Sequence, residues 1–193
     1  LSLGDNAFYG CVSVGTLTLG NSLRTIGNYA FFNLSALTGL SLPASVETIG
    51  KCAFKGCSSL TGVILPATLR EVLGNAFYGC HAATFYLEDG IDTSAWNSRW
   101  NSSYRPTVSG VTLSEDKTCV TGLTVNENTV ANTKKLADDI LGIAAPVREG
   151  YVFAGFAAED GTVYPADELE TVPAGTVLTA KWTAAPEKAD PEG

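Results

Sequence analysis

The chain has 193 residues, of which 45% are hydrophobic, and 12 lysines and arginines stand against 20 aspartates and glutamates, a net charge of −8. This length fits one or two domains with a real hydrophobic core. No basic cluster is present, which argues against nucleic acid and anionic membrane surfaces as partners. A stretch of about 20 apolar residues is also missing, so we expect no direct membrane insertion.

A repeat of 23 residues occupies the first part of the chain. The dipeptide Ala-Phe recurs at that spacing four times, with its phenylalanines at positions 8, 31, 54 and 77. Other apolar columns keep the same step, among them Leu3, Ile26, Ile49 and Val72. Self-similarity at a fixed period of this length is typical of a solenoid. One turn alone cannot fold, so stacked turns must share their apolar faces.

Each repeat contains one predicted strand. In residues 37–43 and 60–66, apolar residues alternate with small or polar ones, which is the period of a strand. Pro43 and Pro66 then end these strands, because proline cannot donate to the ladder. The remaining apolar positions of each repeat are expected to point inward on the return leg.

The run LPASVETIGKCAFKGCSSLTGVILP, residues 42–66, resembles the BspA-type bacterial leucine-rich repeat. The resemblance covers residues 1–88 and implies a right-handed solenoid with a parallel sheet on its concave side. It also implies a bacterial secreted or cell-surface protein, of a kind often linked to adhesion or host contact. The last repeat departs from the pattern at residues 72–74, where the usual glycine is shifted by one.

Two columns are candidates for ligand binding. Leucine-rich repeats usually bind through the outward positions of their concave strands, and here these positions carry neither charge nor aromatic rings: Thr16, Thr18, Gly39, Ser41, Gly62 and Ile64. A second column follows each Ala-Phe pair: Tyr9, Phe32, Lys55 and Tyr78. These side chains either pack between turns or form an exposed aromatic stripe for contact with a protein or glycan.

Cys11, Cys57 and Cys80 share one repeat column. Cys57 and Cys80 would lie on adjacent turns, about 4.8 Å apart by strand spacing, within reach of a disulfide. The alternative is a stack of buried thiols that act as small apolar groups. Leu34 in the same column favours that alternative.

Residues 89–109 are interpreted as a cap and connector. Trp96 and Trp100 are four residues apart, a helical spacing that places both indoles on one face. We expect them to cover the open end of the solenoid. The alternative is an aromatic platform for a sugar or peptide.

Residues 110–183 are predicted to form a small β-rich module. Residues 110–116 and 119–125 alternate like a hairpin, and residues 131–143 contain a helical stretch with Leu136, Ile140 and Ile143 on one face. Residues 148–182, with Gly150, Tyr151, Phe153, Gly155, Leu178, Ala180, Lys181 and Trp182 at matching positions, are similar to the internalin-type B repeat, or Listeria–Bacteroides repeat, which implies a β-grasp-like α+β fold. Residues 184–193 are rich in alanine, proline and acid and are interpreted as a flexible linker.

The fold expected is therefore mainly β: a leucine-rich-repeat solenoid of about four turns, residues 1–88, followed by the β-grasp-like module. The single histidine, His81, has no catalytic partner at a readable spacing, and no nucleophile elbow, phosphate loop or metal-ligand motif is present. We expect no enzyme, no cofactor and no metal site.

Two hypotheses for function remain. One is a surface binding module for an unidentified host or bacterial surface protein or glycan, and the other is a spacer that displays further domains. Both imply an extracellular or cell-surface location. Because the sequence starts within a repeat, we also expect upstream repeats, and a signal peptide and anchor outside this stretch.

Overall fold

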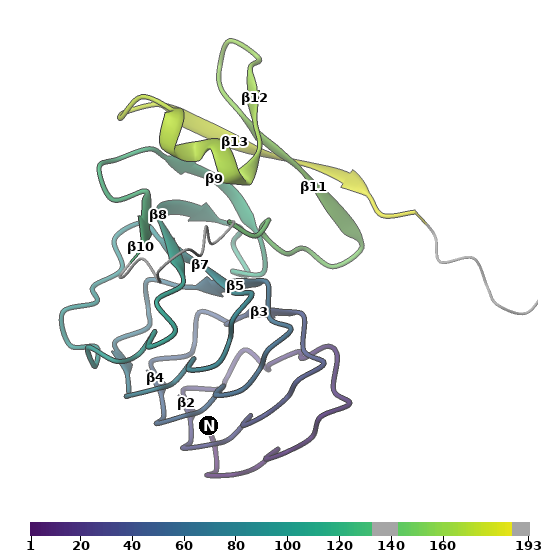
Figure 1. Ribbon diagram of the computed structural model, residues 1–193, viewed down its shortest axis with the longest axis vertical. Helices are drawn as coiled ribbons and strands as arrows, with labels where there is room; N and C mark the ends of the chain where they lie inside the picture. The colour runs from purple at the N-terminus through teal and green to yellow at the C-terminus, as the bar shows by residue number, and fades with distance from the viewer. Residues whose placement is uncertain (133–142, 187–193) are drawn as a thin grey trace, which may run out of the picture.

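The 23-residue period becomes one turn of a β-solenoid (Figure 1). The computed structural model describes residues 1–132 and 143–186. One sheet runs along an edge of the stack and contains four short parallel strands in the order β1 (Ser2–Leu3), β2 (Thr25–Ile26), β4 (Thr48–Ile49) and β6 (Glu71–Val72). Ser2 pairs with Thr25, and Thr25 with Thr48, so the register of the strands equals the period of the sequence.

A second sheet contains the strands that the alternating segments predicted: β3 (Gly39–Ser41), β5 (Gly62–Leu65) and β7 (Thr84–Glu88). They are parallel, and Leu40 pairs with Val63, which pairs with Phe85. The predicted solenoid with a parallel sheet is therefore confirmed, and it has about five turns rather than four.

The core of the solenoid is a stack of repeated apolar side chains. Phe31, Phe54 and Phe77 are fully buried, and their ring centroids lie 5.1 and 5.2 Å apart along the stack. The alanine before each phenylalanine is also buried, and its carbonyl accepts a hydrogen bond from the phenylalanine N–H of the preceding turn, as in Phe31 N to Ala53 O at 2.8 Å. The Ala-Phe pair thus combines an inward ring with a backbone link between turns.

The glycine column follows from the close approach of neighbouring turns. A Cβ atom at Gly50 would lie 2.6 Å from the backbone nitrogen of Asn28 on the preceding turn, and one at Gly27 would lie 2.7 Å from the backbone nitrogen of Asp5. Real Cβ atoms do not come so close to backbone, so only glycine allows this spacing.

Residues 89–102 continue the solenoid as its last turn rather than leaving it at residue 88. The N–H of Asn97 donates to Val72 O at 2.9 Å, and the N–H of Phe77 donates to Trp100 O at 3.1 Å. Trp96 is 8% exposed, and Trp100 packs against the same core, 4.9 Å from the ring of Phe85. Both indoles cover the end of the core as expected, but they lie in turns, so the helical spacing was misleading.

The C-terminal module continues the second sheet instead of starting a new one. Strand β8 (Pro106–Leu113) pairs in parallel with β7 and antiparallel with β9 (Val120–Thr124), which confirms the predicted hairpin. The remaining elements are β10 (Val130–Asn132), β11 (Tyr151–Ala157), β12 (Val163–Tyr164), the 3₁₀ helix η1 (Ala166–Thr171) and β13 (Val177–Ala184). The nine-stranded sheet has the order β12-β11-β13-β9-β8-β7-β5-β3, with β10 paired to β8.

The expected helix of the module falls mostly outside the described residues. Residues 131 and 132 belong to β10, and Leu136 and Ile140 lie in the part that the structure does not describe. Ile143 is described and packs against the core of the module. A β-grasp fold and a B-repeat module therefore stay predictions. Ala184, the first residue of the expected linker, still belongs to β13, and residues 187–193 lie outside the described residues.

Candidate functional site

The outer face of the second sheet carries a column of side chains whose exposure to solvent falls along the stack. Register places Ser41, Ile64, Tyr86 and Val108 side by side, and Thr18 precedes them by one period. Thr18 is exposed, Ser41 is partly exposed, and Ile64 and Tyr86 are fully buried. The expectation that Ile64 is open to a partner is wrong, because it belongs to the core of the C-terminal module.

This module rests on the outer face through close backbone contacts. A Cβ atom at Gly39 would lie 3.0 Å from Cγ1 of Val147, and one at Gly62 would lie 3.0 Å from the carbonyl oxygen of Ala145. Ser41 Oγ donates to the Thr118 carbonyl at 3.0 Å, at the rim of the contact. The missing side chains at the two glycines therefore make room for the chain's own segment and not for a partner.

Tyr86 anchors the same contact. Its hydroxyl donates to the carbonyl of Ala144, and the N–H of Ala144 donates to Thr84 Oγ1 at 2.8 Å. Burial raises the pKa of Tyr86 above its ordinary value. The folded chain thus keeps this proton at pH values where an unfolded chain releases it.

Tyr86→Phe is expected to make the chain less sensitive to alkali. Unfolded tyrosine ionises at about pH 10, so the raised pKa is neutral for stability below that pH and costs stability as pH rises above it. The variant lacks the hydroxyl and therefore does not lose stability in this way at high pH. It does lose the hydrogen bond to Ala144, which lowers its stability by about 1 kcal/mol at every pH. Urea unfolding at about pH 8 and about pH 11 measures both effects. Tyr9→Phe removes the same hydroxyl from an exposed ring and is the control; equal pH profiles in the two variants would contradict the prediction.

A second column forms a ladder on the edge of the solenoid, and we call Tyr9, Phe32, Lys55 and Tyr78 the edge ladder. The rings of Tyr9 and Phe32 are stacked, with centroids 4.6 Å apart and an angle of 7°. The Lys55 ammonium lies 5.8 Å from the centroid of Phe32 and 5.3 Å from that of Tyr78, so it sits between two rings. Tyr9 is 54% and Tyr78 is 46% exposed, and Phe32 and Lys55 are partly exposed.

Backbone hydrogen bonds between neighbouring turns hold the residues of the edge ladder at the spacing of the turns. Phe32 O accepts from Gly10 N at 2.8 Å, Lys55 O accepts from Asn33 N at 2.7 Å, and Tyr78 O accepts from Gly56 N at 2.8 Å. Since the phenylalanine before each rung points into the core, the rung itself points outward. The repeat therefore fixes one outward side chain per turn.

Sequence reasoning missed two members of this surface. Lys55 was in the column but not among the candidate site residues, and it now provides the cation between two rings. Tyr29 belongs to another column and lies 5.8 Å from Phe32 at an angle of 52°. A hydrogen bond with Cys52 raises the pKa of Tyr29. The three-residue spacing between Tyr29 and Phe32 was the signal that could have found it.

The other aromatic candidates are less open. Trp96 is almost fully buried, and Trp100 is partly buried between Phe77, Phe85 and Trp96. They fill the last turn, which leaves only part of one indole for a platform.

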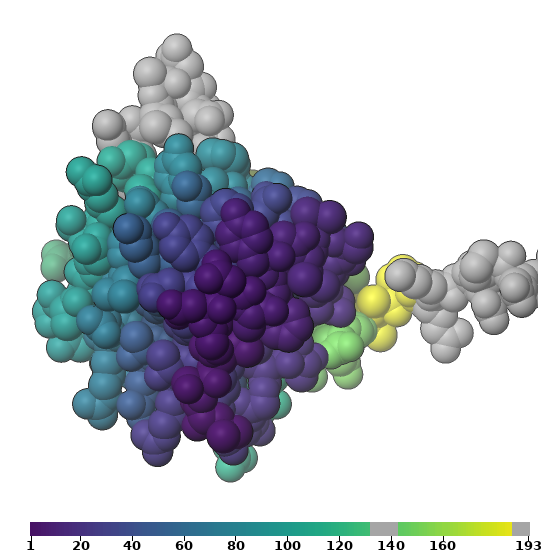
Figure 2. Space-filling view, turned by 90° about the horizontal axis from the view of Figure 1, so that it is seen from below, coloured from purple at the N-terminus to yellow at the C-terminus, as the bar shows by residue number. Residues whose placement is uncertain are grey.

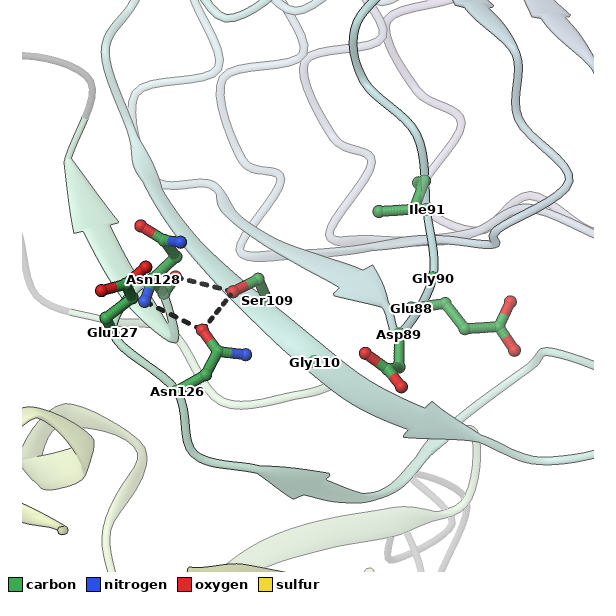
Figure 3. A pocket seen from close by; sticks show the side chains of 9 residues that line it. All are labelled: Glu88, Asp89, Gly90, Ile91, Ser109, Gly110, Asn126, Glu127 and Asn128. Atoms are coloured by element: carbon green, nitrogen blue, oxygen red, sulfur yellow. Dashed lines mark hydrogen bonds between the residues drawn. The ribbon is translucent and has the colours of Figure 1, made fainter. Parts of the chain in front are cut away.

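A hollow of about 310 Å³ lies between β7 and the start of the module (Figure 3). Several of its polar groups already have hydrogen-bond or ion-pair partners. Ser109 Oγ donates to the carbonyl of Asn128 at 2.7 Å, and Glu88 pairs with Lys117 and accepts the N–H of Ala67. Across the described ranges 1–132 and 143–186, no group of three or more histidine, cysteine, aspartate and glutamate side chains could hold a metal ion.

A polar turn closes the β8–β9 hairpin. The Asp116 carboxylate accepts from Thr118 Oγ1 and from Ser114 Oγ, both at 2.7 Å, and these bonds lower the pKa of Asp116. The turn thereby presents the Thr118 carbonyl to Ser41.

The cysteines are free thiols. Cys57 Sγ donates to Phe31 O at 3.3 Å, and Cys80 Sγ donates to Phe54 O at 3.2 Å, both inside the core. Of the two alternatives, the structure therefore shows buried thiols. In the part of the chain that the structure describes, no helix is long and apolar enough to cross a bilayer.

Two solved structures are similar to part of the chain. A leucine-rich repeat protein of T. pallidum is 31% identical over 46% of this chain and 42% of its own, with a TM-score of 0.43. A leucine-rich repeat protein of Bacteroides ovatus is 33% identical over 50% of this chain and 27% of its own, with a TM-score of 0.44. The chain thus spans less than half the length of either protein.

A family model extends further along the sequence. The model described as a BspA type leucine rich repeat region matches residues 1–102 in six copies, beyond the expected end at residue 88. No curated protein matches the chain. Since the model covers more than half of the 193 residues, the chain belongs to the BspA-type leucine-rich repeat family.

Proposed function

We propose that this chain is a binding module of a bacterial surface or secreted repeat protein, and that it contacts its partner through the edge ladder. The observation that carries the proposal is the alignment of three rings and a lysine, one per turn, with Tyr9 and Tyr78 about half exposed. Exposed aromatic side chains are the usual anchors of binding surfaces. BspA-type repeats are typically found on bacterial surface proteins, which supports the location.

The C-terminal module covers much of the outer face of the second sheet. We therefore assign the binding site to the edge ladder rather than to the strand positions of that face. Ile64 is buried and Ser41 is partly exposed and already bonds to Thr118, so Thr16 and Thr18 are the exposed members of the candidate strand positions. Two threonines offer little apolar area for a partner. Catalysis has no part in this proposal.

The same covering also favours the second candidate, a spacer that binds nothing itself. A chain that uses its concave face for its own module has given up the surface through which such repeats usually bind. The two candidates differ in whether the ladder has a partner.

The triple variant Tyr9→Ala, Phe32→Ala and Tyr78→Ala is expected to lose binding by about 30-fold or more, since anchor residues contribute roughly 2 kcal/mol or more. The measurement is saturable binding of the purified chain to a panel of glycans and extracellular matrix proteins. Val12, Val163 and Val177 are 47%, 43% and 66% exposed outside the ladder, and their triple alanine variant is the matched control.

A thermal melt of each variant separates lost binding from lost folding. Equal binding by the ladder variant and the parent would move the site elsewhere on the chain. If the unmodified chain binds no member of the panel, the spacer hypothesis is favoured.

A further inference from the structure

We infer that the edge ladder takes an acidic polysaccharide, with a carboxylate or sulfate group placed at Lys55; this inference rests on the proposed function. Four features lead to it: the orientation of the rings, the lysine between them, the charge of this edge and the recurrence of one outward side chain per turn.

The stacked rings present their edges rather than their faces. Tyr9 and Phe32 are nearly parallel at 7°, and Lys55 lies over faces of Phe32 and Tyr78, so the inner ring faces are occupied by neighbours on the ladder. A neutral sugar stacks on a ring face, and the faces between neighbouring side chains of the ladder are already occupied. Ring edges carry the positive end of the aromatic quadrupole, and they therefore favour an anionic group.

Lys55 adds a full charge at the centre of this edge. Its ammonium is within 6 Å of two ring centroids and is held there by cation–π attraction. Those contacts use the ring faces and leave N–H donors for a ligand. The side chain is partly exposed, so an anion can reach it.

This edge is positive although the chain is strongly acidic. The four segments 4–10, 27–33, 50–56 and 73–79 carry Lys51 and Lys55 against one acid, Asp5, whereas the whole chain has a net charge of −8. The Asp5 carboxylate accepts hydrogen bonds from Asn28 N at 2.7 Å and Asn28 Nδ2 at 3.1 Å. These bonds hold the Asp5 carboxylate at the first turn, where it keeps its charge, and with Lys51 and Lys55 the four segments sum to a net charge of +1.

The ladder fits a repeating polymer better than a peptide. Its side chains recur once per turn, at about the 4.8 Å spacing of neighbouring strands, so a polymer of identical units can contact several turns at once. Peptides usually bind in side-chain pockets or grooves, or along a free strand edge. The hollows lined by Ser114, Glu115 and Asp116 and by Glu88 with its neighbours lie away from the ladder.

The test is binding of the purified chain to immobilised heparin, which is sulfated, and polygalacturonate, which is carboxylated. Dextran is the neutral comparison and polyglutamate the acidic peptide. We expect binding to one or both acidic polysaccharides, weakened between about 0.1 M and about 1 M salt as the Debye length falls from about 10 Å to about 3 Å. The stronger of the two identifies sulfate or carboxylate as the recognised group.

Lys55→Gln is expected to weaken this binding about tenfold and to flatten its salt dependence, because a charged hydrogen bond is lost. Lys55→Arg should retain most of the affinity. Lys181→Gln removes the same charge from an exposed site in the module and should bind as the parent does. A melt of each variant confirms folding.

Three outcomes overturn the inference. Equal binding to polyglutamate would show that any polyanion suffices and would point to an acidic protein partner. Binding to dextran that salt leaves unchanged would show that charge has no part. Failure to bind both acidic polysaccharides would exclude the ligand class, while the proposed function would stand if the wider panel gives a signal that the ladder variant loses.

Discussion

Ile64→Asp is expected to release the C-terminal module from the outer face of the solenoid. Ile64 is fully buried in the core of the module and lies outside the core of the solenoid. A carboxylate at this position loses its water without gaining a partner, which costs about 4 kcal/mol or more together with the lost packing. Hydrogen exchange should rise in β11, β13 and η1 and stay low in β2, β4 and β6.

Thr18→Asp is the matched control for this substitution. Thr18 lies in the same column two turns earlier and is exposed, so a carboxylate there keeps its water. Its effect on stability should be within about 0.5 kcal/mol. If β11 and β13 stayed protected in Ile64→Asp, the module would not depend on this contact. Release together with any gain of ligand binding would identify the outer face as a second recognition surface.

Phe54→Ala is expected to be the most damaging substitution within the solenoid. The ring is fully buried between Phe31 and Phe77, at centroid distances of 5.1 and 5.2 Å. Truncating a buried phenylalanine costs about 3–5 kcal/mol through lost transfer energy and the remaining cavity. Each ring pair adds about 0.5–1.5 kcal/mol. Urea unfolding measures the loss.

Phe8→Ala makes the same chemical change in the same column but at the first turn. Phe8 is 43% exposed and stacks on one ring, Phe31, at 5.5 Å. Figure 2 looks onto this first turn, drawn in purple at the near face of the molecule. The loss should be about 1–2 kcal/mol, near that of an average substitution. Equal losses at positions 8 and 54 would show that neighbouring turns do not share the burial.

Much of the fold could be predicted because equivalent positions of every repeat carry similar residues and take the same place in each turn. The 23-residue step assigned Phe31, Phe54 and Phe77 to one inward stack, and alternation assigned Leu40 and Val63 to the inner side of strands. The last turn was harder, because Trp96 and Trp100 replace the usual residues and their spacing suggested a helix. Hydrogen bonds to Val72 and Phe77 show that it continues the stack.

The candidate surfaces illustrate the limit of this reasoning. By itself, the sequence determined the period, the inward columns and the outward position of Ile64 and its equivalents in the strands, and it left open whether Tyr9 and its column pack between turns or face solvent. Only the tertiary structure decided which outward positions meet solvent: Tyr9 is 54% exposed, whereas Ile64 is fully buried. The physical reason is that local periodicity records which side of its own turn a residue takes. Whether that side is then covered depends on a segment about 80 residues later, around Val147. The contact between this segment and the repeats has no periodic pattern in the sequence of either one.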